Sequence, residues 1–232
     1  MDDLGLPFEN FDHYGRLMTT DLVLDPEATA KNVDYKGKPL GDVLDAVPPL
    51  PAAWRQLVAF AAGYYQRSVG ELALSVLPPE LRKLDAAQLA RRVARLSASP
   101  ATVHEDAAAP ALNTTQQAAV QALAAMIPGT TLLHGVTGSG KTEVYLQAAA
   151  AALAAGRQVL VLVSEINLTP QLEARFAARF AGHRMVSLHS ALTPAQRLKH
   201  WLSAHLGHAD LVLGTRLAVF ASMPQLGLIV VD

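Results

Sequence analysis

The sequence contains no cysteine. This absence excludes disulfide bonds and thiolate metal centres, so we expect no zinc in this chain. The sequence also lacks an apolar run of the roughly 20 residues that a membrane-spanning helix needs. Its beginning, MDDLGLPFENFD, is acidic where a secretory signal would be basic. We therefore expect a cytoplasmic protein that does not contact a membrane.

The sequence has almost no net charge. Its formal charge is −1, whereas proteins that bind nucleic acid usually carry a basic excess. The balance shifts along the chain, because residues 112–232 hold 8 Lys and Arg against 5 Asp and Glu. This mildly basic second half suits a phosphate-bearing ligand without requiring one.

Short apolar runs alternate with helical stretches from residue 112 onward. The runs are TLLH, QVLVLVS, MVSLHS, DLVLGT and LIVVD, and such alternation is typical of a parallel sheet covered by helices. Thr169 with Pro170, and Thr193 with Pro194, predict two helix starts, since each pair places a capping hydroxyl before a proline. We therefore expect an α/β fold for residues 112–232.

The first half of the sequence predicts helices with less regularity. Trp54, Val58 and Tyr65 fall on one helical face, together with Leu57 and Ala61, which predicts that these side chains pack in a core. A further amphipathic helix is predicted over residues 85–96. Its polar face carries Arg91, Arg92 and Arg95, and we interpret that face as solvated rather than as a DNA contact.

The string GVTGSGKT, Gly135 to Thr142, fits the phosphate-binding P-loop pattern in full. It follows the predicted strand TLLH and precedes a predicted helix, which is the context that this motif requires. Its glycines let backbone N–H groups turn toward phosphate oxygens, and the helix N-terminus adds a positive dipole. Lys141 is expected to pair with the β and γ phosphates, and Thr142 to bind Mg²⁺. The alternative, a chance glycine-rich turn, fits the flanking elements poorly.

A second magnesium ligand is predicted where the last apolar run ends. In LIVVD, Asp232 directly follows a predicted buried strand, and P-loop enzymes hold Mg²⁺ through an acid at such a strand end. Hydrolysis also needs a group that orients the attacking water, which in many such enzymes follows this acid directly. Since no residue follows Asp232 here, we expect half of the catalytic pair.

Two further strand ends are expected at the same edge of the sheet, in SEINLTPQ (residues 164–171) and GTRLAVF (residues 214–220). A helix N-terminus at Thr169 and a Gly-Thr-Arg turn can both hold a phosphate backbone. Ordinary helix capping and a structural role for Arg216 explain the same residues equally well. Spacing alone therefore leaves nucleic-acid contact open.

Five strings together resemble, in order and spacing, the family of primosomal protein N′ (PriA), the replication-restart helicases of superfamily 2. They are LNTTQQ, GVTGSGKTEVYL, SEINLTPQ, LHSAL and GTRLAVF. The resemblance implies an incomplete RecA-like lobe of an ATP-dependent DNA helicase that moves 3′ to 5′ in replication restart. It also implies ATP and Mg²⁺ as cofactors, single-stranded and forked DNA as ligands, and primosome and replication-restart proteins as partners.

The resemblance assigns roles residue by residue. Lys141 and Asp232 would be catalytic, with Asp232 opening the family's DEEH box and holding Mg²⁺ together with Thr142. The nucleotide-binding residues would be Gln116, Gly135, Gly138, Ser139, Gly140, Lys141 and Thr142. The residues along the DNA track would be Glu165, Thr169, Gln171, Thr215 and Arg216.

Residues 41–83 resemble, in part, the end of the family's N-terminal domain, which captures DNA 3′ ends. The sequence therefore implies an N-terminal helicase fragment that binds nucleotide, and DNA weakly, without unwinding DNA. Its expected parts are an acidic segment of uncertain structure over 1–40, a mostly helical DNA-binding remnant over 41–83, a helix and linker over 84–111, and the first part of helicase lobe 1 over 112–232.

Two other function classes remain open on the sequence. One is a non-catalytic DNA-binding module in which residues 41–83 bind DNA and the P-loop is a relic. The other is a P-loop kinase or transferase, for which no acceptor-site residues are evident. His200, His205 and His208 have the wrong spacing for a metal site on one helical face, and we expect them at a polar helix end.

Overall fold

The computed structural model describes residues 44–98, 110–125, 129–136, 138–164 and 168–232. The predicted site residue Glu165, the acidic segment 1–40 and most of the predicted linker lie outside these residues. The chain divides into two compact units, which are described separately below. The first comprises Met1–Pro100, Ser190–His208 and Phe220–Pro224, and the second comprises Ala101–His189, Ala209–Val219 and Gln225–Asp232.

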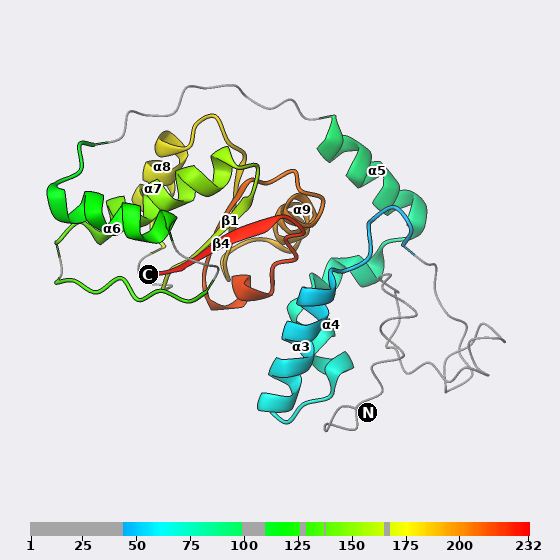
Figure 1. The fold of residues 1–232 in the computed structure, drawn as a ribbon. Helices are drawn as coiled ribbons and strands as arrows, with labels where there is room; N and C mark the ends of the chain where they lie inside the picture. Colours follow the sequence, from blue (N-terminus) through cyan, green and yellow to red (C-terminus); the bar gives the residue numbers. More distant parts are fainter. Residues whose placement is uncertain (1–43, 99–109, 126–128, 137, 165–167) are drawn as a thin grey trace. The chain divides into compact units, whose positions relative to one another are not determined.

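A four-stranded parallel sheet forms the centre of the second unit (Figure 1). The order across the sheet is β2-β3-β1-β4, with β1 pairing β3 on one side and β4 on the other. Four of the five predicted apolar runs form these strands, so the α/β prediction is confirmed. They are β1 (Gln158–Leu162), β2 (Met185–Leu188), β3 (Leu211–Gly214) and β4 (Leu226–Val231).

Three α-helices accompany the sheet: α6 (Thr114–Ala124), α7 (Lys141–Ala154) and α8 (Pro170–Arg179). Thr169 caps α8 as predicted, since its hydroxyl accepts a hydrogen bond from the Leu172 N–H at 3.2 Å. Side chains of α7 and α8 pack on β1, β3 and β4 in one buried apolar cluster. Its fully buried members include Leu146, Ala149, Val159, Val161, Phe176, Phe180, Leu211 and Leu213.

The predicted strand TLLH is wrong. Thr131 to His134 have no regular secondary structure, and Leu132 is 86% exposed. A parallel strand needs a hydrogen-bonded neighbour, and residues 131–134 form no ladder with any of the four described strands, although β4 has an open edge. The apolar run alone was therefore insufficient to predict a strand.

The first unit is helical. Its elements are α3 (Ala52–Tyr64), α4 (Val69–Val76), the 3₁₀ helix η1 (Pro79–Lys83), α5 (Ala86–Ser97) and α9 (Pro194–His205). Capping boxes start α5 at Asp85 with Gln88, and α9 at Thr193 with Gln196. A second 3₁₀ helix, η2 (Arg216–Phe220), follows β3 and ends at the border of the two units.

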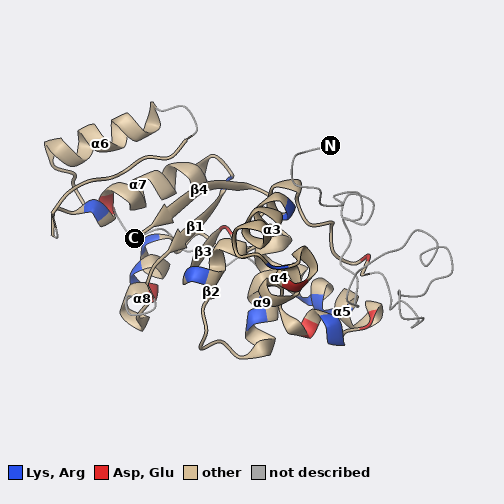
Figure 2. Cartoon of the chain, turned by 90° about the horizontal axis from the view of Figure 1, so that it is seen from below, with Lys and Arg blue, Asp and Glu red and all other residues tan. Residues whose placement is uncertain are grey.

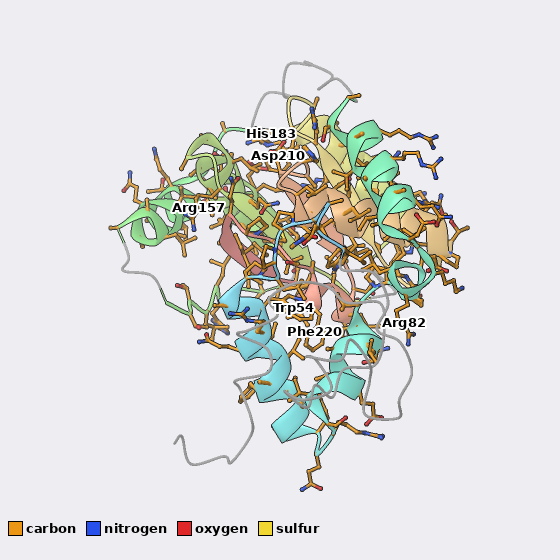
Figure 3. The ribbon with its side chains drawn as sticks, turned by 90° about the vertical axis from the view of Figure 1, so that its right-hand side faces the viewer. Trp54, Arg82, Arg157, His183, Asp210 and Phe220 are labelled. Atoms are coloured by element: carbon orange, nitrogen blue, oxygen red, sulfur yellow. The ribbon has the colours of Figure 1, made fainter. Side chains whose placement is uncertain are left out.

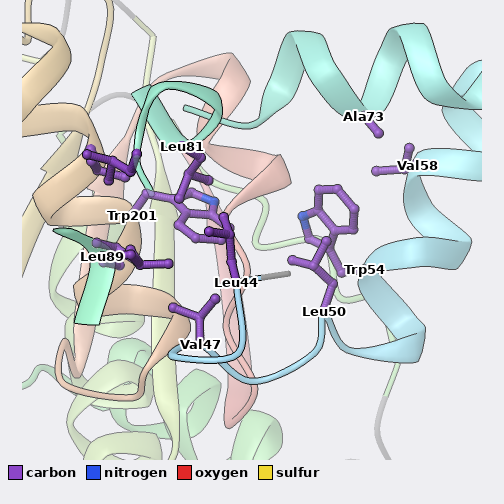
Figure 4. Close-up of a cluster of buried hydrophobic side chains, with 12 residues drawn as sticks. Leu44, Val47, Leu50, Trp54, Val58, Ala73, Leu81, Leu89 and Trp201 are labelled. Atoms are coloured by element: carbon purple, nitrogen blue, oxygen red, sulfur yellow. The ribbon is translucent and has the colours of Figure 1, made fainter. Parts of the chain in front are cut away.

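The core of the first unit joins segments from both ends of the sequence (Figure 4). Trp54 of α3 and Trp201 of α9 are both buried in it, with leucines and valines from residues 44–89. The Trp54 indole N–H donates a hydrogen bond to the Phe220 carbonyl oxygen at 2.7 Å, and the two residues lie side by side in Figure 3. The predicted core position of Trp54 is confirmed.

The prediction for Tyr65 is wrong, because this side chain is 65% exposed. Tyr65 closes α3 as its C-terminal cap, where the chain leaves the helix and the helical face is no longer maintained. The amphipathic prediction for α5 is confirmed, because Leu89 is fully buried and Arg91, Arg92 and Arg95 are exposed. Figure 2 shows blue basic segments on α5. Among the described residues, no helix is both long and apolar enough to cross a membrane.

His205 is buried in the first unit, contrary to the predicted polar helix end. Its Nε2 lies 2.8 Å from the Pro48 carbonyl oxygen, and its Nδ1 lies 2.8 Å from the Ser222 hydroxyl. Because a carbonyl only accepts, Nε2 carries the proton and Nδ1 accepts from the hydroxyl. Burial lowers the pKa of His205, and the hydrogen bond to Pro48 offsets part of this effect.

We predict that protonation of His205 destabilises the first unit. In the unfolded chain the pKa of His205 is about 6.5, and in the folded unit it is lower. As pH falls, the unfolded chain therefore binds a proton before the folded unit does. Stability is therefore full above the unfolded pKa and falls as pH drops from 7 to 5. Urea unfolding at several pH values should show this slope in the wild type and in His200→Gln, and a flatter slope in His205→Gln. A wild-type slope in His205→Gln would contradict the prediction.

Candidate nucleotide-binding site

The carboxyl ends of the four parallel strands meet at one edge of the sheet, which is where α/β folds bind ligands. Backbone hydrogen bonds continue the ladder just past the strands. The Asp232 N–H donates to Leu162 at 2.9 Å, and the Thr215 N–H donates to Leu188 at 3.1 Å. Asp232 and Thr215 are therefore fixed at this edge, as their sequence positions predicted.

The P-loop leads directly into α7, whose first residue is Lys141. Gly138 and Gly140 have φ of 81° and 80°, in the left-handed region that other L-residues rarely adopt. The Lys141 ammonium donates to the carbonyl oxygens of Gly135 and Val136, at 2.8 and 2.9 Å. This ammonium is thus held over the loop in front of the α7 N-terminus, where a phosphate would lie.

Gln116 connects α6 to the P-loop. Its side-chain oxygen and backbone N–H form a capping box with Asn113 at the start of α6. Its amide Nε2 donates to the Gly140 carbonyl oxygen at 3.3 Å. A Cβ added at Gly140 would collide with the same Nε2, so the Gln116 side chain would have to move away from the loop. Gln116 therefore lies against the P-loop, and its predicted role in nucleotide binding stays a prediction.

Tyr145 is a site residue that sequence reasoning missed. Its phenol O–H donates to the Asp232 carboxylate Oδ2 at 3.0 Å, and the Thr142 side chain lies close enough to the phenol to lower its pKa. One side chain thus lies beside both the P-loop threonine and the strand-end aspartate. Burial raises the pKa of Tyr145 to about 12, and the nearby Asp232 carboxylate adds to this rise. The spacing of three residues after Thr142 was the available signal, since i and i+3 share a helical face.

We predict that Tyr145→Phe removes this link and keeps the packing. The loss of one partly buried hydrogen bond to a carboxylate should lower the free energy of unfolding by about 1 kcal/mol. Urea unfolding of the variant and the wild type measures the difference. Tyr64→Phe, at an exposed tyrosine, is the matched control and should leave stability unchanged. Equal effects of the two substitutions would contradict the assigned hydrogen bond.

A buried ion pair orients the P-loop helix. Glu143 in the first turn of α7 lies 3.8 Å from the Arg179 guanidinium at the end of α8, and both side chains are largely buried. The Glu143 carboxylate also accepts a hydrogen bond from Gln147 at 3.1 Å. These contacts fix the rotation of α7 about its axis, so Thr142 and Tyr145 keep their positions relative to Asp232.

The residues at this edge fit a magnesium nucleotide. Mg²⁺ in P-loop proteins takes one protein hydroxyl, phosphate oxygens and water, so it needs no cage of protein carboxylates. Within the described ranges, no group of three His, Asp or Glu residues is placed to hold a metal. Thr142 and Asp232, both near the Tyr145 phenol, are the hydroxyl and the carboxylate that could hold a Mg²⁺–phosphate ligand here.

The predicted DNA-track residues take different environments. Thr169 caps α8, and Gln171 is exposed in the first turn of the same helix. Thr215 is buried, and its carbonyl oxygen accepts the Ala218 N–H at 2.7 Å, which makes it part of the turn after β3. Arg216 is exposed at the start of η2. The exposed pair, Gln171 and Arg216, is better placed to meet a ligand than Thr215.

Two family models match the sequence. Residues 113–232 match the DEAD/DEAH box helicase model. Residues 14–78 match the model of the PriA 3′ DNA-binding domain. This match begins 27 residues before residue 41, the first residue of the region that the sequence analysis compared with this domain. The two matches follow one another along the chain. Together they cover most of the second unit, which contains the P-loop, and much of the helical first unit.

Curated relatives described as replication restart protein PriA agree with these matches. The relative from Synechocystis is 54% identical over 101 residues, which are 44% of this chain and 12% of the relative. The relative from Treponema pallidum is 44% identical over 123 residues, 53% of this chain and 19% of the relative. The relative from Rickettsia conorii is 34% identical over 177 residues, 76% of this chain and 26% of the relative.

The aligned regions thus span between 12% and 26% of the length of these relatives. The helicase match alone covers more than half of this chain, from residue 113 to residue 232. Helicases of this class use a nucleotide and Mg²⁺, which agrees with the residues at the sheet edge. The chain therefore belongs to the DEAD/DEAH box helicase family, in its replication-restart (PriA) branch.

Proposed function

We propose that this chain is the nucleotide-binding and DNA-capturing part of an ATP-dependent DNA helicase that acts in replication restart and moves 3′ to 5′. The observation that carries the proposal is the hydrogen bond to Asp232 from Tyr145, which lies on the P-loop helix beside Thr142. It brings together two motifs 90 residues apart in the sequence, at the edge where P-loop proteins bind nucleotide. On its own, the chain binds Mg·ATP and DNA without unwinding DNA.

In this proposal the residues of the second unit have separate tasks. Lys141 exchanges its two loop carbonyls for the β and γ phosphates of ATP, and the N–H groups of Gly138, Ser139 and Gly140 bind the remaining phosphate oxygens. Thr142 and Asp232 hold Mg²⁺, the latter through water. Bound Mg·ATP supplies the phosphoanhydride bond whose cleavage powers movement along DNA. Gln116 lies on the adenine side of the loop.

DNA is proposed to bind both units of the chain. The proposed track comprises Glu165, Thr169, Gln171, Thr215 and Arg216. In it the exposed Gln171 and Arg216 contact phosphates, while Thr169 caps α8 and the buried Thr215 holds the turn after β3. The 3′ DNA-binding domain match over residues 14–78 supports capture of a DNA end by the helical part. We keep 41–83 and 112–232 as the two functional regions, with 84–111 as helix and linker between them. Single-stranded and forked DNA, and other replication-restart proteins, are the proposed partners.

Nucleotide selectivity tests the proposal in this chain. Isothermal titration should show Mg·ATP and Mg·ADP binding at least tenfold more tightly than AMP, because only the first two present a β-phosphate to Lys141. Equal affinities would contradict a working P-loop. Direction is tested in a protein that extends this chain to the length of its relatives. It should unwind a partial duplex with a 3′ single-stranded tail on the translocating strand, and fail on the 5′-tailed form.

A further inference from the structure

Three aromatic side chains at the end of α3 are exposed to solvent. Phe60 is 70% exposed, Tyr64 72% and Tyr65 65%. The Phe60 and Tyr64 rings are stacked, with centroids 6.2 Å apart and planes at 25°. The Tyr64 and Tyr65 rings meet edge to face at 5.0 Å and 86°. We call these three rings the α3 aromatic cluster.

The rings of this cluster support one another rather than the core. Trp54, Val58, Ala61 and Ala62 supply the buried face of α3, so the cluster is on the face that the helix leaves open. An exposed phenylalanine loses its hydrophobic stabilisation, and a contiguous exposed aromatic patch marks an interaction site. Flat aromatic faces of this kind are what nucleic-acid bases stack on in single-strand binding proteins.

The backbone after the cluster is unusual. Gln66 has φ of 53°, which makes it the one non-glycine residue with left-handed backbone among the described residues. It ends α3 with two backbone bonds, Gln66 N–H to Gly63 at 3.2 Å and Arg67 N–H to Ala62 at 2.9 Å, an arrangement that normally uses glycine. Such a strained position, which costs roughly 1 kcal/mol, is characteristic of functional sites.

A cation follows the three aromatic residues in the sequence. The exposed Arg67, which follows the turn, is held by Glu71 at 3.1 Å. A guanidinium next to aromatic faces can contact a phosphate while the neighbouring bases stack. All of these residues fall within residues 14–78, which match a 3′ DNA-binding domain. The location, the ring exposure and the strained turn therefore point to the same class of ligand.

We propose that Phe60, Tyr64 and Tyr65 form a stacking surface for the bases of single-stranded DNA. This proposal rests on the DNA-binding part of the proposed function and deepens it, because it names the side chains and the chemistry of contact. The rings bind bases through their faces and therefore without reading sequence. Arg67 contributes to phosphate binding and is secondary to the rings.

Two oligonucleotides of equal length and charge separate base stacking from phosphate binding. One is oligo(dT) and the other is an abasic strand, and both are titrated with the whole chain by fluorescence anisotropy. Phe60→Leu and Tyr64→Leu keep an apolar, helix-forming side chain but remove the ring, and each should weaken oligo(dT) binding by about 5-fold to 100-fold. Tyr64→Phe, which keeps the ring, should bind within twofold of the wild type. Abasic binding should be the same in all variants.

Each other outcome overturns the proposal. If both strands bind the wild type equally and the leucine variants bind as the wild type does, the stacking surface fails while DNA binding stands. If the wild type binds neither strand, the proposed DNA-binding function fails with it. If the leucine variants lower the melting temperature by several degrees and leave oligo(dT) affinity unchanged, the rings pack against protein rather than bases.

Discussion

Lys141→Ala is expected to weaken Mg·ATP binding by about 100-fold, which corresponds to roughly 2.7 kcal/mol. The ammonium of Lys141 is held 2.8 and 2.9 Å from two loop carbonyls at the α7 N-terminus. Exchanging these carbonyls for phosphate oxygens gives charge-assisted hydrogen bonds worth about 1.5–3 kcal/mol each. Alanine forfeits these bonds and leaves the backbone cradle intact.

Isothermal titration of Mg·ATP measures this loss. Lys199→Ala, at an exposed lysine of α9, is the matched control and should bind ATP as the wild type does. Because Lys141 is on the loop surface and outside the buried clusters, its alanine variant should keep the wild-type melting temperature within a few degrees. An affinity within threefold of the wild type would contradict the assigned role.

The same variant separates the helicase function from a non-catalytic DNA-binding module with a relic P-loop. If the chain is part of a helicase, bound ATP should change the DNA affinity of the wild type, and Lys141→Ala should abolish this change. If the chain is a non-catalytic DNA-binding module, ATP should leave the DNA affinity unchanged in both the wild type and Lys141→Ala. Anisotropy titrations with and without Mg·ATP distinguish the two, since linkage requires that any coupling be mutual.

Trp54→Ala is expected to lower the free energy of unfolding of the first unit by about 3–5 kcal/mol. Trp54 is buried among the apolar side chains of residues 44–89 and donates a hydrogen bond to Phe220. Alanine leaves a cavity and an unpaired carbonyl, each of which is destabilising. Since domains are stable by only about 5–15 kcal/mol, this single change should bring the unit close to unfolding.

The two tryptophans provide an internal control for the hydrogen bond. The Trp201 indole N–H finds no acceptor among the described residues, whereas Trp54 has one. Trp54→Phe should therefore cost about 1 kcal/mol more than Trp201→Phe. Urea unfolding followed by circular dichroism measures all three variants. A cost below about 1 kcal/mol for Trp54→Ala would contradict the core assignment.

Local sequence patterns predicted those elements that depend on neighbouring residues. The capping pairs at Thr169 and Thr193 start helices as predicted, because a cap needs only the next three residues. Gly156, just after the end of α7, has φ of 70°, the left-handed conformation in which glycine commonly ends a helix. The central strands β1 and β3 were visible as apolar runs because successive residues of both strands are buried, so that both of their faces are covered.

Features that depend on distant residues were missed. His205 meets Pro48, 157 positions away, so no local pattern could place it in a core. TLLH has the composition of a strand, but strand formation requires a partner strand that composition does not reveal. Tyr145 and Asp232, 87 positions apart, meet only because β4 lies next to β1 at the sheet edge. The nucleotide motif was therefore predictable, whereas the residue that links its two halves was not.

The dependence of ATP affinity on Mg²⁺ tests the site most directly. Isothermal titration with and without Mg²⁺ should show that the metal strengthens ATP binding to the wild type at least tenfold. Thr142→Ala and Asp232→Asn should each lose most of this enhancement and retain the metal-free affinity, because Lys141 and the loop still bind phosphate. If Mg²⁺ strengthens binding equally in all three proteins, Thr142 and Asp232 do not hold the metal and the account of this site is wrong.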